Sequence, residues 1–390
     1  MKYLKSFLIK VIAHFTLLTA YILFPIVQIK FGRIYSNRLG HLGYNLDNYI
    51  SFNLKKRVVT FFCYDEPISN KMLFNLFKKK KNIIFSNKIK FLYFEFLKIN
   101  PSSKILVSYK NELHPKISFF SAFPKNISTT DNMNEIEEIL KKNKIENKFI
   151  CIHNRDDEYL SENNLKDENY HSFRNYKIED LKISIEYLIK QGFHVVRVGK
   201  INNDKLLINS DRYIDLTGNF YNEKDQLTII ENCYFFIGCN SGITILPRLF
   251  RKPSLLINYI PFNIFEMTAW SKNSIFLPKK IYTVSDNRCL NFKEMNNLNY
   301  NIHNKKNFFE DKNLLIKNNT KDEILKSVIE MVNYVNNDFK KKEELTKIND
   351  NFWNFITNED NKNKINGIRK KLNLSISGEF IKDNKELVED

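Results

Sequence analysis

The sequence predicts an α/β protein of two domains, preceded by a hydrophobic helix. Three observations support this fold class. The chain has 390 residues, 43% of them hydrophobic, which is enough for two separate cores. Apolar runs of strand length alternate with segments of helical spacing along most of the chain. Several of those runs are apolar at every position, as in the strands of a parallel sheet covered on both faces.

The hydrophobic helix is expected within residues 1–27, because residues 11–27 carry no formal charge. Seventeen residues are fewer than the roughly 20 that a spanning helix needs, and Pro25 lies near the end of the run. Lys10 before it and Lys30 after it suit anionic lipid headgroups. We therefore expect a membrane-associated helix, peripheral or monotopic, on the cytoplasmic face of the inner membrane. A buried first helix of a soluble domain is the alternative.

The first α/β domain and its connection to the second are expected over residues 28–147. Strands are predicted at 28–35, 57–63 and 103–109, and helices at about 42–49 and 72–80. The polar stretch 125–147 reads as the connection, with a short amphipathic helix at about 134–144.

The second domain is expected over residues 148–320, followed by helices and a polar tail over 321–390. Predicted strands are 149–153, 193–199, 213–216, 234–238 and 254–259. Predicted helices are 177–190, 223–232, one after Ser241, and two in the closing segment at about 322–336 and 343–357. Gly192 is expected to end the first of these helices, because the position after a helix often requires the left-handed conformation, which glycine adopts at the least cost.

The amino-acid composition restricts the classes of partner that this protein could bind. The net charge is +17, and it comes from 50 lysines and only 11 arginines among the 61 basic residues. A solvated lysine-rich surface and an anionic partner, either a membrane surface or a phosphate-bearing ligand, both remain open. No recognition motif supports nucleic-acid binding. The five cysteines form no CxxC pair, which argues against a zinc cluster or a disulfide framework.

A binding site is predicted at the carboxyl edge of the second sheet, where open parallel sheets hold their ligands. The turn Gly238-x-x-Ser241-Gly242 follows one strand and precedes a predicted helix. Backbone N–H groups at such a helix start, with Ser241 and two glycines, can seat an anion. An ordinary strand-to-helix turn is the alternative reading.

The arginines suggest which anion this site binds. Six of the eleven fall within residues 151–251. Arg155 at a strand end, Arg174 on the loop that follows, and Arg197 at the next strand end are the candidates. A guanidinium grips phosphate oxygens in a bidentate fork that lysine cannot form. We interpret the three as ligands of a nucleotide diphosphate, although each alone could form a structural salt bridge.

One catalytic candidate lies in the first domain. His41, in Arg38-Leu39-Gly40-His41, can serve as a general base toward an acceptor hydroxyl. A helix cap or a packed histidine is the simpler reading, and Asp65-Glu66 and His114 are weaker rivals. No Asp-x-Asp occurs in the chain, so we expect no obligatory metal ion and no cofactor.

Several motifs form one pattern: Arg38-Leu39-Gly40-His41-Leu42, His153-Asn154-Arg155, His171-Ser172-Phe173-Arg174-Asn175, Val196-Arg197-Val198-Gly199, Phe235-Phe236-Ile237-Gly238-x-x-Ser241-Gly242 with Pro253, and Ile376-Ser377-x-x-Phe380-Ile381. This pattern, spanning about residues 30–385, resembles a family of bacterial surface-polysaccharide glycosyltransferases. The resemblance implies a GT-B fold, in which two Rossmann-like domains face a central cleft. It also implies transfer of a hexose or deoxyhexose from a nucleotide diphosphate sugar to a growing glycan, such as O-antigen or capsule, on a lipid-linked or oligosaccharide acceptor.

The pattern is more distantly similar to two other groups. His153-x-Arg155 is similar to the His-x-Arg motif of GDP-fucose fucosyltransferases, where the arginine binds the β-phosphate of the donor. The Gly238–Gly242 turn is similar to the donor-site turn of heptosyltransferases. Asp156-Asp157 replaces the Gly-Asp of the first group, and Thr244-Ile245 replaces the histidine of the second. The donor's sugar and base therefore stay open.

Two other functions remain compatible with this scaffold. One is a pyruvyl or glycerol-phosphate transferase, because a fold does not determine the reaction. The other is a catalytically inactive nucleotide-binding assembly protein at the membrane.

Overall fold

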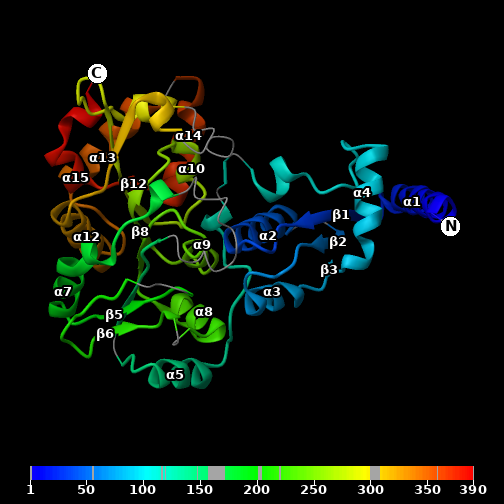
Figure 1. The fold of residues 1–390 in the computed structure, drawn as a ribbon, viewed down its shortest axis with the longest axis horizontal. Coiled ribbons are helices and arrows are strands. Elements are labelled where there is room, and N and C mark those ends of the chain that lie inside the picture. Colours follow the sequence, from blue (N-terminus) through cyan, green and yellow to red (C-terminus); the bar gives the residue numbers. More distant parts are fainter. Residues whose placement is uncertain are drawn as a thin grey trace. The chain divides into compact units, whose positions relative to one another are not determined.

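The computed structural model describes residues 2–54, 57–115, 117–118, 120–146, 148–156, 172–200, 204–218, 221–298, 308–357 and 359–389. The chain divides into two compact units, residues 1–128 and 129–390 (Figure 1). Each unit contains its own parallel sheet. The predicted mixed α/β fold with a large parallel sheet is confirmed.

The first unit is a small sheet with helices around it. Its strands, in the order β1-β2-β3, are β1 (Gln28–Ile34), β2 (Val58–Tyr64) and β3 (Ile83–Phe85), and all pairs are parallel. Its α-helices are α1 (Lys2–Leu23), α2 (Leu39–Asn53), α3 (Lys71–Lys78) and α4 (Lys90–Ile99). The sequence did not predict β3 or α4, because they follow a lysine-rich run with little apolar periodicity.

The strand predicted at 103–109 is wrong, because only one isolated β-bridge forms there. Phe31 of β1 pairs with Leu106 alone, through bonds to Ile105 O and from Val107 N, each 2.8 Å. The Glu112 carboxylate then accepts from Ser108 N at 2.9 Å, and a π-helical turn, η2 (Tyr109–Leu113), follows. This local side-chain bond turns the chain away from the sheet before a ladder can extend.

The second unit contains a seven-stranded parallel sheet in the order β12-β9-β8-β7-β4-β5-β6. The strands are β4 (Phe149–Ile152), β5 (His194–Arg197), β6 (Tyr213–Asp215), β7 (Phe236–Gly238), β8 (Ser254–Tyr259), β9 (Ser274–Pro278) and β12 (Ser375–Ile376). The chain winds outward from β4 through β5 to β6, then returns to the other side of β4 with β7. Apart from β12, this is the doubly wound order of dinucleotide-binding folds.

Helices and a two-stranded antiparallel sheet complete the second unit (Figure 1). They are α5 (Met133–Lys142), α7 (Lys182–Lys190), α8 (Glu223–Asn232), α9 (Ile245–Leu249), α10 (Ile264–Met267), α11 (Phe292–Asn297), α12 (Lys321–Asn336), α13 (Glu343–Ile356), α14 (Glu359–Leu372) and α15 (Gly378–Asp383), with the antiparallel pair β10 (Lys280–Thr283) and β11 (Leu314–Lys317). Gly192 follows α7 with φ of 90°, the left-handed conformation expected of it.

The ends of the second unit differ from the predicted segments. Helix α5, predicted as part of the connection, packs on α8, and Lys142 forms a 2.7 Å ion pair with Asp225. The tail beyond residue 358 forms a helix, and then β12 pairs with β9 through Ser375 and Ile376. Both segments are therefore parts of the compact unit that contains residues 129–390.

Helix α1 packs on the first unit by one narrow stripe. Ala13, Leu17 and Ala20 are buried in a cluster with Phe31 and Phe96. In the described part of the chain, no helix combines the length and hydropathy that crossing a membrane requires.

Gly32 of β1 tests how tightly the first core is packed. A Cβ at this position would overlap the buried ring of Phe62 and lie 3.0 Å from Val107 Cβ. We expect Gly32→Ala to destabilise the protein by about 2 kcal/mol, because neither the buried Phe62 ring nor the buried Val107 side chain can move aside freely. The lowered midpoint should be seen in thermal unfolding followed by circular dichroism.

Gly367→Ala is the matched control. Gly367 lies inside α14, and a Cβ there would meet nothing within 4 Å. Alanine should be neutral or stabilising there by up to about 1 kcal/mol. Equal effects of the two substitutions would contradict the close packing at β1.

Candidate functional site

The end of β4 lies at the point where the strand order of the second sheet reverses. Its neighbours are β5 on one side and β7 on the other. Arg155 lies three residues beyond β4, and its guanidinium donates to the Asn175 side chain. Tyr176 N bonds to Arg155 O at 3.2 Å, and the Tyr176 hydroxyl donates to His153 O. These bonds hold the segment 172–176 against the strand end, where such folds bind their ligands.

Arg174 is placed beside Arg155 by this segment. Its Nε atom is buried and donates no hydrogen bond, and no described residue forms an ion pair with its guanidinium. Burial and the charge of Arg155 lower the pKa of Arg174 to about 10. The two arginines therefore lie together, as predicted.

Lys279 adds a third cation that the sequence did not reveal. It follows β9 directly and is 3% exposed. Its ammonium donates to two neutral acceptors, Phe173 O at 2.7 Å and Asn175 O at 3.0 Å. Burial, and then the charge of Arg155, lower the pKa of Lys279 to about 8. The signal in the sequence is the apolar run 275–277 before Pro278, which was not predicted as a strand.

The turn after β7 lies next to these cations. Burial raises the pKa of the Cys239 thiol, while the charges of Arg155, Lys279 and Arg174 act in the opposite direction. Three cations from three separate segments therefore surround the carboxyl ends of β4 and β7. We call Arg155, Arg174 and Lys279 the cation cluster. Among the described residues, neither Arg174 nor Lys279 has a carboxylate within 4 Å, so the cluster is suited to an anion.

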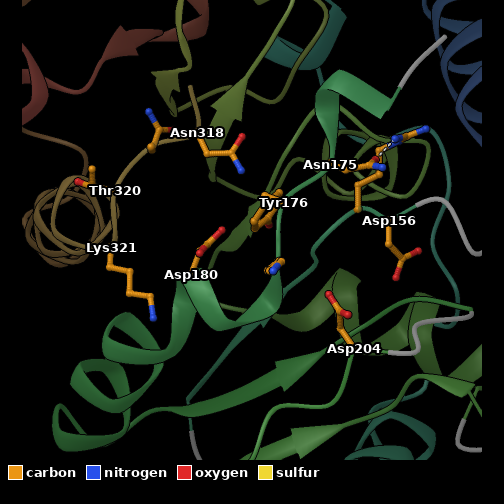
Figure 2. A pocket seen from close by; sticks show the side chains of 11 residues that line it. Asp156, Asn175, Tyr176, Asp180, Asp204, Asn318, Thr320 and Lys321 are labelled. Carbon is orange, nitrogen blue, oxygen red and sulfur yellow. Dashed lines mark hydrogen bonds between the residues drawn. The ribbon is translucent and has the colours of Figure 1, made fainter. Parts of the chain in front are cut away.

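A polar hollow of about 590 Å³ opens beside the cluster (Figure 2). Arg155 and Asn175 line it together with the starts of two helical segments, residues 176–180 and 318–321. Carboxylates from Asp180 and Asp204 also face this hollow. Arg155 is the member of the cluster that lines the hollow, and Lys177 and Lys321 add further cations to the lining. The hollow thus combines cations with hydrogen-bond acceptors, which suits a ligand carrying both phosphates and hydroxyls.

His153 contributes no charge to the site. Its Nδ1 lies 3.0 Å from Val198 O, and burial with the charges of Arg197 and Arg155 lowers its pKa to about 4. The ring is therefore neutral at physiological pH, with the proton on Nδ1 where it can bond the carbonyl.

Arg197 has a structural environment instead of the expected place at the site. It is fully buried, and its guanidinium donates to Asn154 Oδ1 at 2.9 Å and to Asp204 O at 2.6 Å. It also forms a 2.9 Å ion pair with Asp215 on the neighbouring strand β6. Each of its guanidinium nitrogens thus has a partner within the fold, and Arg197 does not line the hollow, so we do not place it among the ligands there.

The turn Gly238–Gly242 also differs from the expected anion seat. Helix α9 starts only at Ile245 and is five residues long, with Pro247 in its first turn. The Ser241 hydroxyl bonds to Thr244 at 2.9 Å instead of capping the helix. Gly238 is packed, since a Cβ there would lie 2.7 Å from the Phe236 ring. The turn adjoins the cation cluster through Cys239, but Ser241 and Gly242 do not line the hollow.

His41 lies in the first turn of α2, within the first unit. Its ring is 5.9 Å from Tyr35 and 6.2 Å from His114, and His114 stacks on Tyr109 at 5.6 Å. Asp65, one of its rivals, forms a two-pronged ion pair with Arg33. His41 and His114 therefore share one aromatic surface at the end of β1.

Two of the predicted features fall partly outside the described residues. His171 is not described, and the polar loop that contains it is described only up to residue 156 and from residue 172. Within the part of the chain that the structure describes, no group of three or more His, Cys, Asp or Glu residues could hold a metal ion.

Searches against protein-family models and against curated proteins find no match to this sequence. Among solved structures, the chain is similar to three glycosyltransferases. The iron-containing heptosyltransferase TibC in complex with ADP-D-β-D-heptose is 12% identical, with a TM-score of 0.44 over 80% of this chain and 77% of that one. ADP-heptose LPS heptosyltransferase II of E. coli is 11% identical, with a TM-score of 0.42 over 64% of this chain and 90% of that one. A family 9 glycosyltransferase from Veillonella parvula is 12% identical, with a TM-score of 0.40 over 64% of this chain and 85% of that one. At these TM-scores we base the function on the residues of the site.

Arg197 and Arg155 should respond differently to the same substitution. Arg197→Met leaves the buried Asn154 acceptor and Asp215 without their partner, so we expect a loss of about 3 kcal/mol of unfolding free energy. Arg155→Met should cost less than about 1 kcal/mol, because Arg155 is only half-buried and lies next to other cations. Urea unfolding of both variants measures the difference. Equal losses would make Arg155 a structural residue as well.

Proposed function

We propose that this protein is a glycosyltransferase that takes a sugar from a nucleotide diphosphate donor. The observation that supports this proposal is the cation cluster. Arg155, Arg174 and Lys279 meet at the strand-order reversal of a doubly wound sheet, and Arg174 has no hydrogen-bond partner among the described residues. A diphosphate would bring negative charge to these cations, and a guanidinium can bind it through two oxygens.

The cluster also suits the chemistry of glycosyl transfer. Negative charge develops on the departing diphosphate as the bond to the sugar breaks. Fixed cations in a water-poor site stabilise that charge more than they stabilise the intact donor. We propose that these side chains, without a divalent ion, provide this stabilisation. The acceptor-rich part of the hollow, including Asp180 and Asp204, would bind hydroxyl groups of the donor.

The first unit is proposed to hold the acceptor, in a GT-B arrangement. His41 would act as the base that takes the proton from the acceptor hydroxyl, with His114 beside it. The Tyr35 and Tyr109 rings offer apolar faces to a sugar; their centroids lie 5.9 Å apart. We propose a growing surface glycan, lipid-linked or free, as the acceptor, and the cytoplasmic face of the inner membrane as the location.

Arg174→Met tests the proposal, because the two expected effects have opposite signs. Removing a cation that forms no ion pair among the described residues should raise the thermal midpoint of the free protein. It should also weaken binding of UDP, GDP, CDP or ADP, whichever the parent binds most tightly, by at least tenfold, about 1.4 kcal/mol. Differential scanning fluorimetry with and without each nucleotide measures both effects.

Arg212→Met is the control for Arg174→Met. Arg212 is exposed and directly precedes β6, at the opposite end of the strand from the site. This control should alter neither quantity. Nucleotide binding that Arg174→Met leaves unchanged would contradict the diphosphate site. The reaction itself is tested by hydrolysis of the corresponding nucleotide sugars, and the proposal fails if the purified protein turns over none of them.

The pKa of Lys279 predicts how nucleotide binding depends on pH. Its ammonium has a pKa of about 8 in the free protein, and a bound anion favours the protonated form. The dissociation constant of the nucleotide should therefore rise above pH 8, by up to tenfold per pH unit. Nucleotide affinity thus falls above pH 8, whereas the stability of the free protein should rise there. The folded pKa lies below the unfolded one, so Lys279 makes stability rise with pH from about 8 to 10.5.

Calorimetric titration between pH 7.5 and about 9.5 measures this effect on either side of the Lys279 pKa. Lys279→Arg stays protonated over that range and should bind with nearly constant affinity. A parent protein whose affinity does not change with pH would remove Lys279 from the site.

A further inference from the structure

Helix α1 exposes a broad apolar face that the first unit does not cover. The packed stripe is Ala13, Leu17 and Ala20, at helical spacing. The exposed large side chains on the rest of the helix and just after it are Phe7, Leu8, Val11, Ile12, Phe15, Leu18, Tyr21, Ile22 and Ile26. Phe15 is 71% exposed, and Val11, Leu18 and Ile22 share its side of the helix, opposite the packed stripe. Contiguous apolar surface of this kind marks an interaction site.

Helix α4 extends this surface. It packs against α1 through Leu92 and Phe96, which belong to the same buried cluster. Tyr93 and Leu97 pack partly buried against that cluster, whereas Phe91, Phe94 and Ile99 are exposed. The sequence predicted one hydrophobic helix here, whereas the structure has a second helix, α4, beside α1 (Figure 1). Both helices expose apolar side chains.

The charges around the helix pair are nearly all positive. No Asp or Glu occurs in the chain before Asp47, and Glu95 is the one acidic residue between Lys88 and Lys104. Lys10 on α1 and Lys98 on α4 are exposed, among other lysines of the pair. A second copy of this chain would bring the same charges together, which opposes association through this face. An anionic lipid surface would complement them.

We propose that the α1–α4 face docks on an anionic bilayer, with α1 lying in the headgroup region and not crossing it. Its apolar residues would enter the acyl boundary, while lysines of the pair contact the headgroups. This assignment does not rest on the proposed function of the second unit, since none of the residues that carry it belongs to the nucleotide site.

Sedimentation of the full chain with vesicles tests the proposal. One set of vesicles contains equal parts of phosphatidylcholine and phosphatidylglycerol, and a second set contains phosphatidylcholine alone. We expect the parent protein to sediment with the anionic vesicles, and at least tenfold more weakly with the neutral ones. Phe15→Glu should reduce the first binding at least tenfold without lowering the thermal midpoint, because Phe15 is already in water in the free protein.

Val284→Glu is the matched control. Val284 is 63% exposed, lies in the second unit and undergoes the same change of charge. It should bind vesicles like the parent. Equal loss in the two variants would show that net charge alone drives binding and would overturn the docking face. The proposal would also fail if the parent stayed in the supernatant, or if sedimentation velocity without lipid showed self-association that Phe15→Glu abolishes.

Discussion

The main physical constraint on the second unit is the positive charge that is buried at one edge of its sheet. Such charge is costly in a folded protein unless a counter-charge compensates it. Among the described residues, neither Arg174 nor Lys279 forms an ion pair, and burial together with the charge of Arg155 lowers the pKa of both. The rest of the edge is organised so that the cations stay together: Lys279 bonds the two carbonyls that flank Arg174, and Tyr176 ties the same segment to β4. An arrangement that lowers stability in this way is typical of a site built for a ligand.

The arginines at this edge differ in role: Arg197 stabilises the fold, whereas Arg155 is a candidate ligand of the hollow. Arg197 satisfies its guanidinium within the sheet, through Asn154 and Asp215, and so fixes the residues that follow β4. Arg155, one residue beyond Asn154, is thereby directed toward the hollow. The same side-chain chemistry serves as scaffold in one case and as candidate ligand in the other, because burial and the nearby carboxylate differ.

The first unit has an uneven distribution of apolar groups. Its sheet is small, and α1 covers it with a stripe of two alanines and one leucine. Most of the large side chains of α1 are therefore not used in packing. A helix that contributes so little to its own core needs another reason for its hydrophobicity, and the surrounding lysines suggest that the partner is anionic.

Apolar periodicity alone predicted the parallel sheet of the second unit, most of its strands and the presence of an N-terminal helix, because uniform or periodic hydrophobicity is a local property. Arg155 was predicted from its position after a buried strand, and Arg174 from the scarcity of arginine in this chain and its place on the loop that follows. Only the tertiary structure distinguished Arg197 from them, because its partner Asp215 lies 18 residues away on a neighbouring strand. Lys279 likewise became a site residue only when β9 joined the sheet beside β8 and brought its end to the cluster. Local patterns determine which segments become strands, but strand order determines which charges meet.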